Sequence, residues 1–267
     1  SESYLVDPAV TLVTVNKRLA AELRARHDAA QAAQGLNAWP SPDILPWNAW
    51  LQRAYAQLVD RGDCTLDLLS RHQELALWES VIGESQTTLL RPAAAAALAS
   101  EAFGLCCAWS LDHATLGAGH IDTRIFARWA QSFEDRLSGR DLIVHAQLAD
   151  EVRRAIEDAR LPLPETLRVA GIDNPPPNVN RLLAAISDRG VTVERLEPGQ
   201  DRARCHRVTA RDAEHEVHLA ARWAAHTLAE RPAARLAIVS SALGAERETI
   251  TRVLTQTLTP NRYLYRG

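Results

Sequence analysis

The sequence of 267 residues contains no methionine and a single lysine, Lys17. Any reaction that needs a lysine side chain would have to use this residue. A nuclease motif of the Asp/Glu-x-Lys type is therefore excluded, because no other lysine can complete it. The other fixed cations are arginines, and the net charge of -3 argues against a protein that binds nucleic acid through a generally basic surface. Any contact with nucleic acid has to be local.

Glycine is missing from the first part of the chain, where a nucleotide-binding protein would need it. Residues 11–15 are a β-branched run that predicts a buried parallel strand, and a helix is expected directly after it, over residues 17–34. A phosphate loop at this turn needs glycines, a lysine, and a Ser or Thr that holds magnesium. The first glycine is Gly35, and Arg18 follows Lys17. The phosphate loop is therefore degenerate, and we expect neither ATPase activity nor a cofactor.

Cysteines are few, and long apolar runs are absent. The four cysteines show neither C-x-x-C spacing nor the density of a disulfide scaffold. Cys106 and Cys107 lie in an apolar helix pattern, which favours inert thiols over a redox pair. No apolar run approaches the roughly 20 residues that span a bilayer, and residues 1–10 lack the pattern of a signal peptide. We therefore expect a cytoplasmic protein without a membrane partner.

Alternating strand and helix patterns predict an α/β fold with a parallel sheet and right-handed crossovers. Helical periodicity dominates residues 39–160, which predicts a large all-helical insertion between the first and second strands. A break at residues 198–202 predicts a first domain, 1–200, and a βαβα unit, 201–267, that either extends the first sheet or opens a second domain. Further strands are expected at 167–171, 191–196, 205–209 and 236–240, and helices at 47–59, 70–82, 92–108, 122–137, 144–159, 178–188, 212–229 and 245–258.

Two short motifs invite a metal-binding interpretation. Asp173 and Asn174 follow a predicted strand, where nucleotide-hydrolysing proteins place acidic side chains for magnesium. With one carboxylate and a proline next in the chain, they are expected to be turn residues. His215 and His218 are three residues apart, whereas the zincin motif needs a spacing of four. A solvated helix face explains them better, so we expect no metal site.

Aromatic and basic side chains supply the candidates for DNA binding, because aromatic rings stack on bases and cations contact phosphates. Trp50, Trp78, Trp129 and Trp223 fall on apolar helical stripes and are expected in the core. The tryptophans near the Pro-rich loop and the cationic start of the first helix are different, although a solvated helix face is the alternative there. The candidate residues are Asn16, Lys17, Arg18, Arg24, Trp39 and Trp47.

Four strings in the sequence point to one family: TVNKRLAAELR at residues 14–24, PDILPWNAWL at 42–51, QELALWE at 73–79 and RVAGID at 168–173. They resemble the N-terminal part of AddB-type bacterial DNA-repair proteins. Proteins of this family are similar to superfamily 1 helicases, and longer members carry a RecB-like nuclease at the C-terminus. The likeness covers most of the chain.

The resemblance implies a RecA-like, P-loop-type sheet in which both ATP motifs are degenerate. Motif I corresponds to residues 14–19, and the motif II position is occupied by Asp173 and Asn174. Residues 212–217 and 236–240 resemble the entry into a second RecA-like domain. The implied function is a non-catalytic, helicase-like region that binds DNA, as a single strand or at a duplex end. It would position a nuclease, outside this chain, during double-strand-break processing.

Two other functions stay open at this point. The chain could be a helical interaction module whose Arg-rich and Trp-bearing surfaces dock a protein partner, such as an active helicase subunit. It could also be an ATPase whose nucleotide site is completed in trans.

Overall fold

The computed structural model describes residues 10–85, 91–196 and 205–259. By its internal contacts the chain divides into two compact units, Ser1–Gly199 and Gln200–Gly267. The predicted boundary at residues 198–202 lies outside the described residues. Each unit is therefore described separately below.

The first unit is built on a four-stranded parallel sheet. The strands are β1 (Val10–Thr14), β2 (Ile44–Pro46), β5 (Thr166–Ala170) and β6 (Thr192–Leu196), in the order β2-β1-β5-β6. All three pairings between neighbours are parallel. The predicted α/β class with a parallel sheet is thus confirmed, and the two central strands are the first strand of the chain and the one that follows the long helical stretch.

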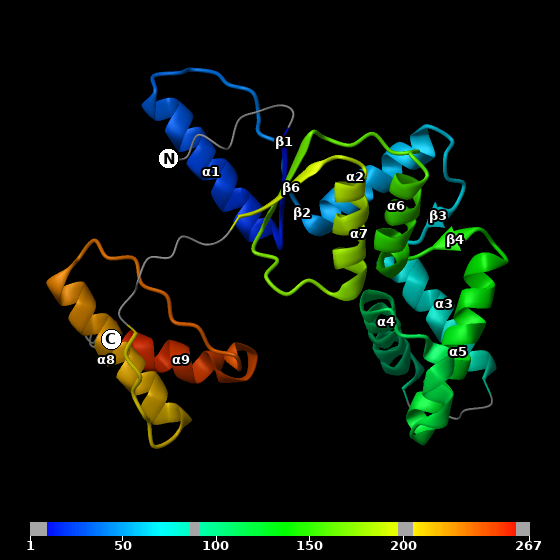
Figure 1. Ribbon diagram of the computed structural model, residues 1–267. Helices are drawn as coiled ribbons and strands as arrows, with labels where there is room; N and C mark the ends of the chain where they lie inside the picture. Colours follow the sequence, from blue (N-terminus) through cyan, green and yellow to red (C-terminus); the bar gives the residue numbers. More distant parts are fainter. Residues whose placement is uncertain (1–9, 86–90, 197–204, 260–267) are drawn as a thin grey trace. The chain divides into compact units, whose positions relative to one another are not determined.

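The two shortest crossovers leave the central strands in opposite directions. Helix α1 (Lys17–Ala33) connects β1 to its neighbour β2, whereas α7 (Pro177–Asp188) connects β5 to β6. Figure 1 shows α1 on one face of the sheet and α7 on the other. The carboxyl ends of β1 and β5 therefore form a topological switch point, the place where open α/β sheets bind ligands.

Local sequence explains where these two helices begin. The Asn16 side chain caps α1, with its Oδ1 accepting a hydrogen bond of 2.9 Å from the backbone N–H of Leu19. Helix α1 ends before Gly35, whose φ of +79° is the left-handed conformation that favours glycine. Helix α7 begins with Pro177, where the missing backbone N–H costs nothing.

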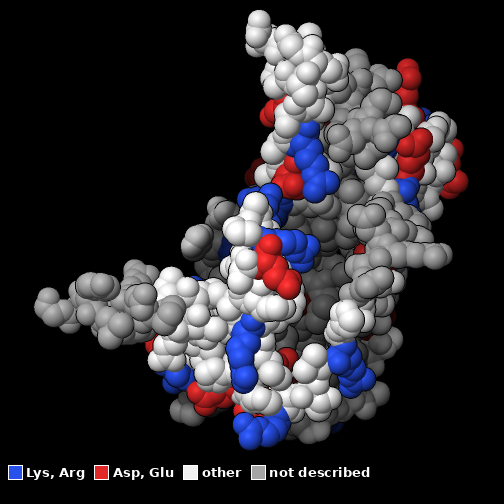
Figure 2. Space-filling view, turned by 90° about the vertical axis from the view of Figure 1, so that its left-hand side faces the viewer, with Lys and Arg blue, Asp and Glu red and all other residues white. Residues whose placement is uncertain are grey.

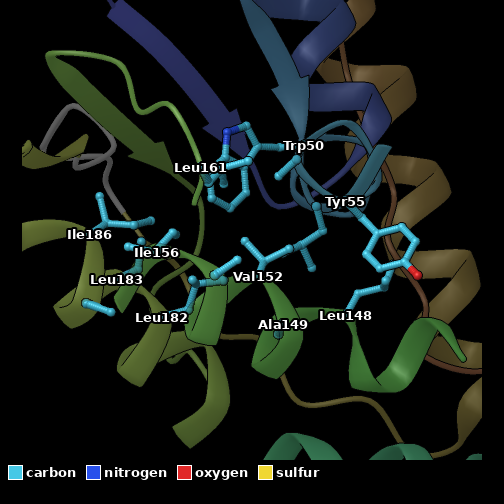
Figure 3. Close-up of a cluster of buried hydrophobic side chains, with 14 of the residues drawn as sticks. Trp50, Tyr55, Leu148, Ala149, Val152, Ile156, Leu161, Leu182, Leu183 and Ile186 are labelled. Carbon is cyan, nitrogen blue, oxygen red and sulfur yellow. The ribbon is translucent and has the colours of Figure 1, made fainter. Parts of the chain in front are cut away.

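The main hydrophobic core lies between the sheet and α2 (Trp47–Asp60), α6 (Leu148–Glu157) and α7. Figure 3 shows the side chains of Val152 and Ile156 from α6 directed toward Leu182 of α7. On the opposite face, α1 packs through a smaller cluster. Its members are Leu12, Leu19, Ala20, Leu23, Ile44, Ala170 and Leu196. The sheet is thus covered on both faces, as its apolar parallel strands require.

A second core lies within the segment between β2 and β5. Helices α3 (Arg71–Glu84), α4 (Pro92–Trp109) and α5 (Ile121–Ser138) pack around the aromatic rings of Trp78 and Phe133, which stack at 3.9 Å between centroids. Both rings are fully buried. The predicted positions of these three helices are confirmed to within two residues at each end.

The same segment also contains strands, so it differs from the expected all-helical stretch. Its first part holds β2, which pairs with β1. Farther along, β3 (Asp67–Leu68) pairs in parallel with β4 (Leu142–Ile143). Both strands are too short to show a period of two, so helical periodicity on either side hid them. Short 3-10 turns, η1 (His113–Ala118) and η2 (His145–Gln147), complete the segment, and the helix predicted at 144–159 is shortened to α6.

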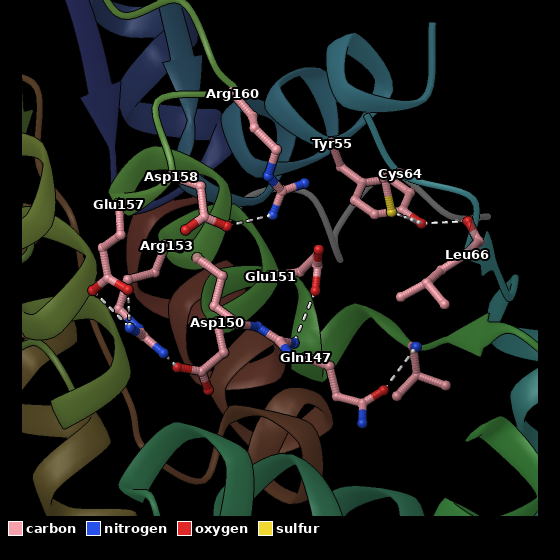
Figure 4. A network of polar contacts seen from close by, with 12 residues as sticks. Tyr55, Cys64, Leu66, Gln147, Asp150, Glu151, Arg153, Glu157, Asp158 and Arg160 are labelled. Atoms are coloured by element: carbon pink, nitrogen blue, oxygen red, sulfur yellow. Dashed lines mark hydrogen bonds and ion pairs between the residues drawn. The ribbon is translucent and has the colours of Figure 1, made fainter. Parts of the chain in front are cut away.

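Polar contacts within α6, and between α2 and the chain that follows it, are drawn in Figure 4. Arg153 lies between Asp150 and Glu157, and its Nη1 is 2.7 Å from a Glu157 oxygen. The hydroxyl of Tyr55 on α2 donates to the carbonyl oxygen of Leu66. Burial first, and then the nearby Cys64 thiol, raises the pKa of Tyr55, so this hydroxyl stays protonated. The Tyr55 hydrogen bond ties α2 to the chain that leads to β3.

Helix α4 is the one helix among the described residues that is long and apolar enough to cross a membrane by length and composition. The sequence interpretation missed it because its small residues do not look like a membrane span. In the fold, Ala99 and Phe103 of α4 are buried in the second core instead. Only 28% of the apolar window of α4 is buried, and its exposed side chains include Leu98, Leu105 and Trp109.

The second unit contains two described helices, α8 (Ala213–Glu230) and α9 (Leu243–Leu258). Both were predicted, but the strands predicted at 205–209 and 236–240 are wrong: those residues form no ladder with any other described segment. Their β-branched residues have strand propensity, yet a strand also needs a hydrogen-bonded neighbour. Val208 and Val239 are accordingly exposed. Trp223 on α8, expected in the core, is 51% exposed.

Candidate functional site

A hollow of about 340 Å³ opens at the topological switch point of the first unit. Val15, directly after β1, and Ile172, just after β5, form its floor. Trp47 from the start of α2 and two small residues of α4, Gly104 and Ala108, form its walls. The helix start of α7 closes it, and the other lining residues are Asn48, Leu51, His145, Ala146, Ala149, Pro176, Asn178 and Val179.

The turn after β1 packs tightly against the turn after β5. Gly171 has φ +72°, and a methyl group at this position would lie 3.1 Å from both Val15 Cγ1 and Leu19 Cδ2. The hydroxyl of Thr14 is buried and donates to the carbonyl oxygen of Asn16 at 2.9 Å. The space beside the first turn of α1 is therefore occupied by apolar side chains instead of an open, glycine-lined loop.

Asn178 is the buried polar side chain of the hollow. It lies in the first turn of α7, is 6% exposed, and its Oδ1 has no hydrogen-bond partner among the described residues. An unsatisfied buried acceptor costs about 1–3 kcal/mol. Because the oxygen itself is buried, a ligand N–H or O–H would reach it only if the Asn178 side chain turned toward the hollow. The remaining surface of the hollow is mainly apolar and includes one aromatic ring, from Trp47.

Two of the three cationic candidates lie in the first turn of α1, at the carboxyl edge of the sheet. Lys17 and Arg18 form the exposed first turn of α1, two and three residues after Val15 of the floor. Arg24 lies about 10 Å farther along the helix, as seven residues of α-helix require. Its guanidinium donates to the carbonyl oxygen of Ile44 in β2. Lys17 and Arg18 do not line the hollow themselves, but they are exposed, follow Val15 closely in the chain, and make no side-chain hydrogen bond or ion pair with a described residue.

The two candidate tryptophans are separated. Trp47 lies in the wall of the hollow and packs against Trp50, with 5.5 Å between ring centroids. Trp39 is on a different part of the surface, where its indole N–H donates to Asp28 Oδ1 of α1 at 2.8 Å. The structure thus brings Asn16, Lys17, Arg18 and Trp47 together at the sheet edge and places Arg24 and Trp39 elsewhere.

The positions with possible metal-binding chemistry do not cluster. Asp173 and Asn174 are exposed residues of the turn after β5. His215 Nδ1 accepts a hydrogen bond of 3.2 Å from the backbone N–H of Arg211, which gives it a role at the start of α8. Within residues 10–85, 91–196 and 205–259, no group of three or more His, Cys, Asp or Glu side chains could hold a metal ion.

Charge is distributed in small groups. On the face drawn in Figure 2, Lys and Arg side chains stand in separate groups with Asp and Glu side chains among them. At the opposite end of the sheet from the hollow, Asp43 is paired with Arg53 at 2.6 and 2.8 Å and accepts from Thr11 at 2.6 Å. A broad basic surface is not seen on the drawn face, so nucleic acid would have to be held locally.

Sequence reasoning missed Asn178, Gly104 and Ala108. Asn178 is a polar residue in the first turn of a helix that follows a predicted strand, a signal that was available. Gly104 and Ala108 lie in an alanine-rich helix far away in the sequence, and no pattern shows that α4 covers this sheet edge.

No protein-family model matches this chain, and no curated protein matches its sequence. The chemistry of the sheet edge therefore carries the functional interpretation. That edge holds two exposed cations in the first turn of α1 and an apolar hollow, whose lining includes the buried side chains of Trp47 and Asn178.

Proposed function

We propose that this chain is the non-catalytic, helicase-like region of an AddB-type, cytoplasmic DNA-repair protein. It binds DNA, as a single strand or at a duplex end, at the carboxyl edge of its parallel sheet. The observation that carries the proposal is the exposed pair Lys17 and Arg18 beside the apolar hollow at the switch point. In a longer parent protein this region would position a nuclease at a processed DNA end.

The geometry suits one nucleotide unit of a single strand. The first turn of α1 offers backbone N–H groups and two cations to a phosphate. The hollow of about 340 Å³ offers an apolar surface to an unstacked base. Trp47 contributes only its edge, because the ring is 9% exposed and packs against Trp50, and the buried Asn178 Oδ1 would accept from a base N–H only after its side chain turns toward the hollow.

The same region supports the interpretation of a RecA-like fold that does not use ATP. Strand β1 leads into α1 at the position of a phosphate loop, but Val15 and Leu19 pack against Gly171 in the space where phosphates would lie. The long segment from α2 to α6 is, in this interpretation, the helical insertion of a superfamily 1 helicase. No ATP hydrolysis is expected from this chain, and it uses no cofactor.

The test is binding of a fluorescent single-stranded oligonucleotide at several salt concentrations. Changing Lys17 and Arg18 together to alanine removes two phosphate contacts, so the slope of log affinity against log salt should fall by about 1.4. Gly104→Leu fills the hollow without touching other atoms at Cβ, and should weaken binding about tenfold at every salt concentration.

Gly83→Leu is the matched control, because Gly83 also lies in a helix with open space at its Cβ but does not line the hollow. It should bind DNA like the unchanged protein. If the charge variant and Gly104→Leu both bind with unchanged affinity, the sheet edge is not the DNA site. A rise in melting temperature with Mg-ATP would instead favour an ATPase completed in trans.

A protein-docking function is the second candidate, and one observation favours it. Helix α4 exposes Leu98, Leu105 and Trp109, and α5 begins with the exposed Ile121. Apolar side chains grouped on one surface mark interaction sites. A helicase partner subunit is the kind of protein that this alternative expects, and its binding would be unaffected by changes at Lys17 and Arg18.

A further inference from the structure

Helix α5 carries a hollow of about 580 Å³ on the side that faces η1. Its apolar lining comes from Ala114 of η1 and from Ile121, Ile125 and Ala127 of α5. The polar lining consists of Gln131 and two arginines, without any acidic residue. This surface therefore combines an apolar depression with positive charge.

The two arginines of this hollow, Arg124 and Arg128, have no side-chain hydrogen bond or ion pair with any described residue. Both are exposed, and they stand four residues apart on the same helix face. Like charges at this spacing repel each other and destabilise a helix. A negatively charged partner would remove this repulsion, whereas Arg136, on the same helix, is already paired with Glu84.

The apolar surface continues on the other side of α5. A second hollow, of about 370 Å³, lies between α4 and α5, and its large apolar lining residues are Leu98, Ile125, Phe126 and Trp129. Its one charged lining residue, Asp122, lies 3.6 Å from His120 Nδ1. Ile125 lines both hollows, so they form one surface across the helix. Leu98 is 66% exposed and Ile121 is 54% exposed. Covering such exposed apolar side chains with a partner is favourable, because it removes their surface from water.

We infer that this α4–α5 surface binds an acidic amphipathic helix of a partner protein. Apolar side chains of the partner, spaced by three and four residues, occupy the two hollows, and flanking Asp or Glu side chains pair with Arg124 and Arg128. An acidic helix is favoured over a basic one because Arg124 and Arg128 would attract carboxylates and repel other cations. A protein helix is favoured over DNA because apolar side chains can cover Leu98 and Ile121, whereas phosphates make no favourable contact with them.

The experiment titrates the full chain with a synthetic helical peptide that has leucines at positions i, i+3, i+4 and i+7 and glutamates beside them. A peptide with lysine at each glutamate position is the comparison. The acidic peptide should bind at least tenfold more tightly than the basic one, and 0.5 M salt should weaken it. Changing Arg124 and Arg128 together to glutamate should lower its affinity at least tenfold.

The matched control changes Arg222 and Arg247 to glutamate, two exposed arginines without a described ion pair that lie in α8 and α9. It alters net charge equally and should leave peptide binding unchanged. A second variant, Leu98→Asp, places charge in the apolar part and should also weaken binding.

Three results would overturn the inference: equal affinity for both peptides, equal loss of affinity in the control variant, or displacement of the peptide by single-stranded DNA. The third would make this surface a nucleic-acid site. The sheet-edge proposal is tested separately, because changes at Lys17 and Arg18 should leave peptide binding intact.

Discussion

Gly171 packs directly against Val15, and a methyl group at Gly171 would lie 3.1 Å from Val15 Cγ1. Gly171→Ala should therefore lower the free energy of unfolding by about 2 kcal/mol, with about 1 kcal/mol from the left-handed backbone and the rest from crowding. Urea unfolding measures this change. Gly190→Ala is the control: its φ is +86°, but a Cβ there meets nothing within 4 Å. An equal cost in both variants would show that Val15 has room to move.

The core of α3, α4 and α5 depends on the ring stack of Trp78 and Phe133. Phe133→Ala removes a fully buried ring, so it should lower the free energy of unfolding by about 3–5 kcal/mol. Leu105→Ala, on an exposed position of α4, should change it by no more than about 0.5 kcal/mol. Chemical denaturation followed by tryptophan fluorescence compares the two. Similar small losses would contradict the packing described.

Asp43 should make stability depend on pH. Burial raises the pKa of Asp43, but hydrogen bonds from Arg53 and Thr11 outweigh it and hold the pKa below its ordinary value of 3.8. The folded state thus favours the carboxylate, and its contribution is complete above the ordinary pKa and is lost as pH falls through the lower folded value. Asp43→Asn should cost about 1 kcal/mol at pH 7 and progressively less below pH 4. A constant difference between pH 7 and pH 3 would contradict it.

The two adjacent thiols of α4 should be unreactive in the folded protein. Burial, with a smaller effect from Glu134, raises the pKa of Cys107 to about 12, and burial also raises that of Cys106. In a protein with Cys64 and Cys205 changed to serine, a thiol reagent at pH 8 should label neither cysteine until urea is added. Rapid labelling without urea would show that α4 opens readily.

Much of the fold was predictable because helices carry local sequence signals, namely capping residues and apolar stripes. The caps Asn16 and Gly35 mark both ends of α1, and the apolar stripe through Phe133 and Leu137 marks the buried face of α5. Strand β2 was missed because three residues in a Pro-rich loop carry no period. The segments at 205–209 and 236–240 show the opposite error, since propensity was present and a pairing partner among the described residues was not.

The candidate site was predictable only in part. The sequence places Lys17 and Arg18 after the first strand, and parallel topology brings them to the same edge as the turn at Gly171. No local signal shows that Gly104 of α4 walls this edge or that Arg24 donates to Ile44. Those facts depend on packing between segments that are distant in the chain, which a single sequence does not reveal.

The short ladder of β3 and β4 has a mechanical consequence. It holds the entry and exit of the α3–α5 segment side by side, with Leu68 and Ile143 in the sheet-side core and Leu69 and Val144 in the other. We expect these helices to unfold as one cooperative unit, with α4 also tied to the sheet layer through its packing on α7. Because Gly104 and Ala108 of α4 line the hollow at the switch point, a ligand bound there should stabilise α4 against local unfolding. Amide hydrogen exchange along α4 should then be slower.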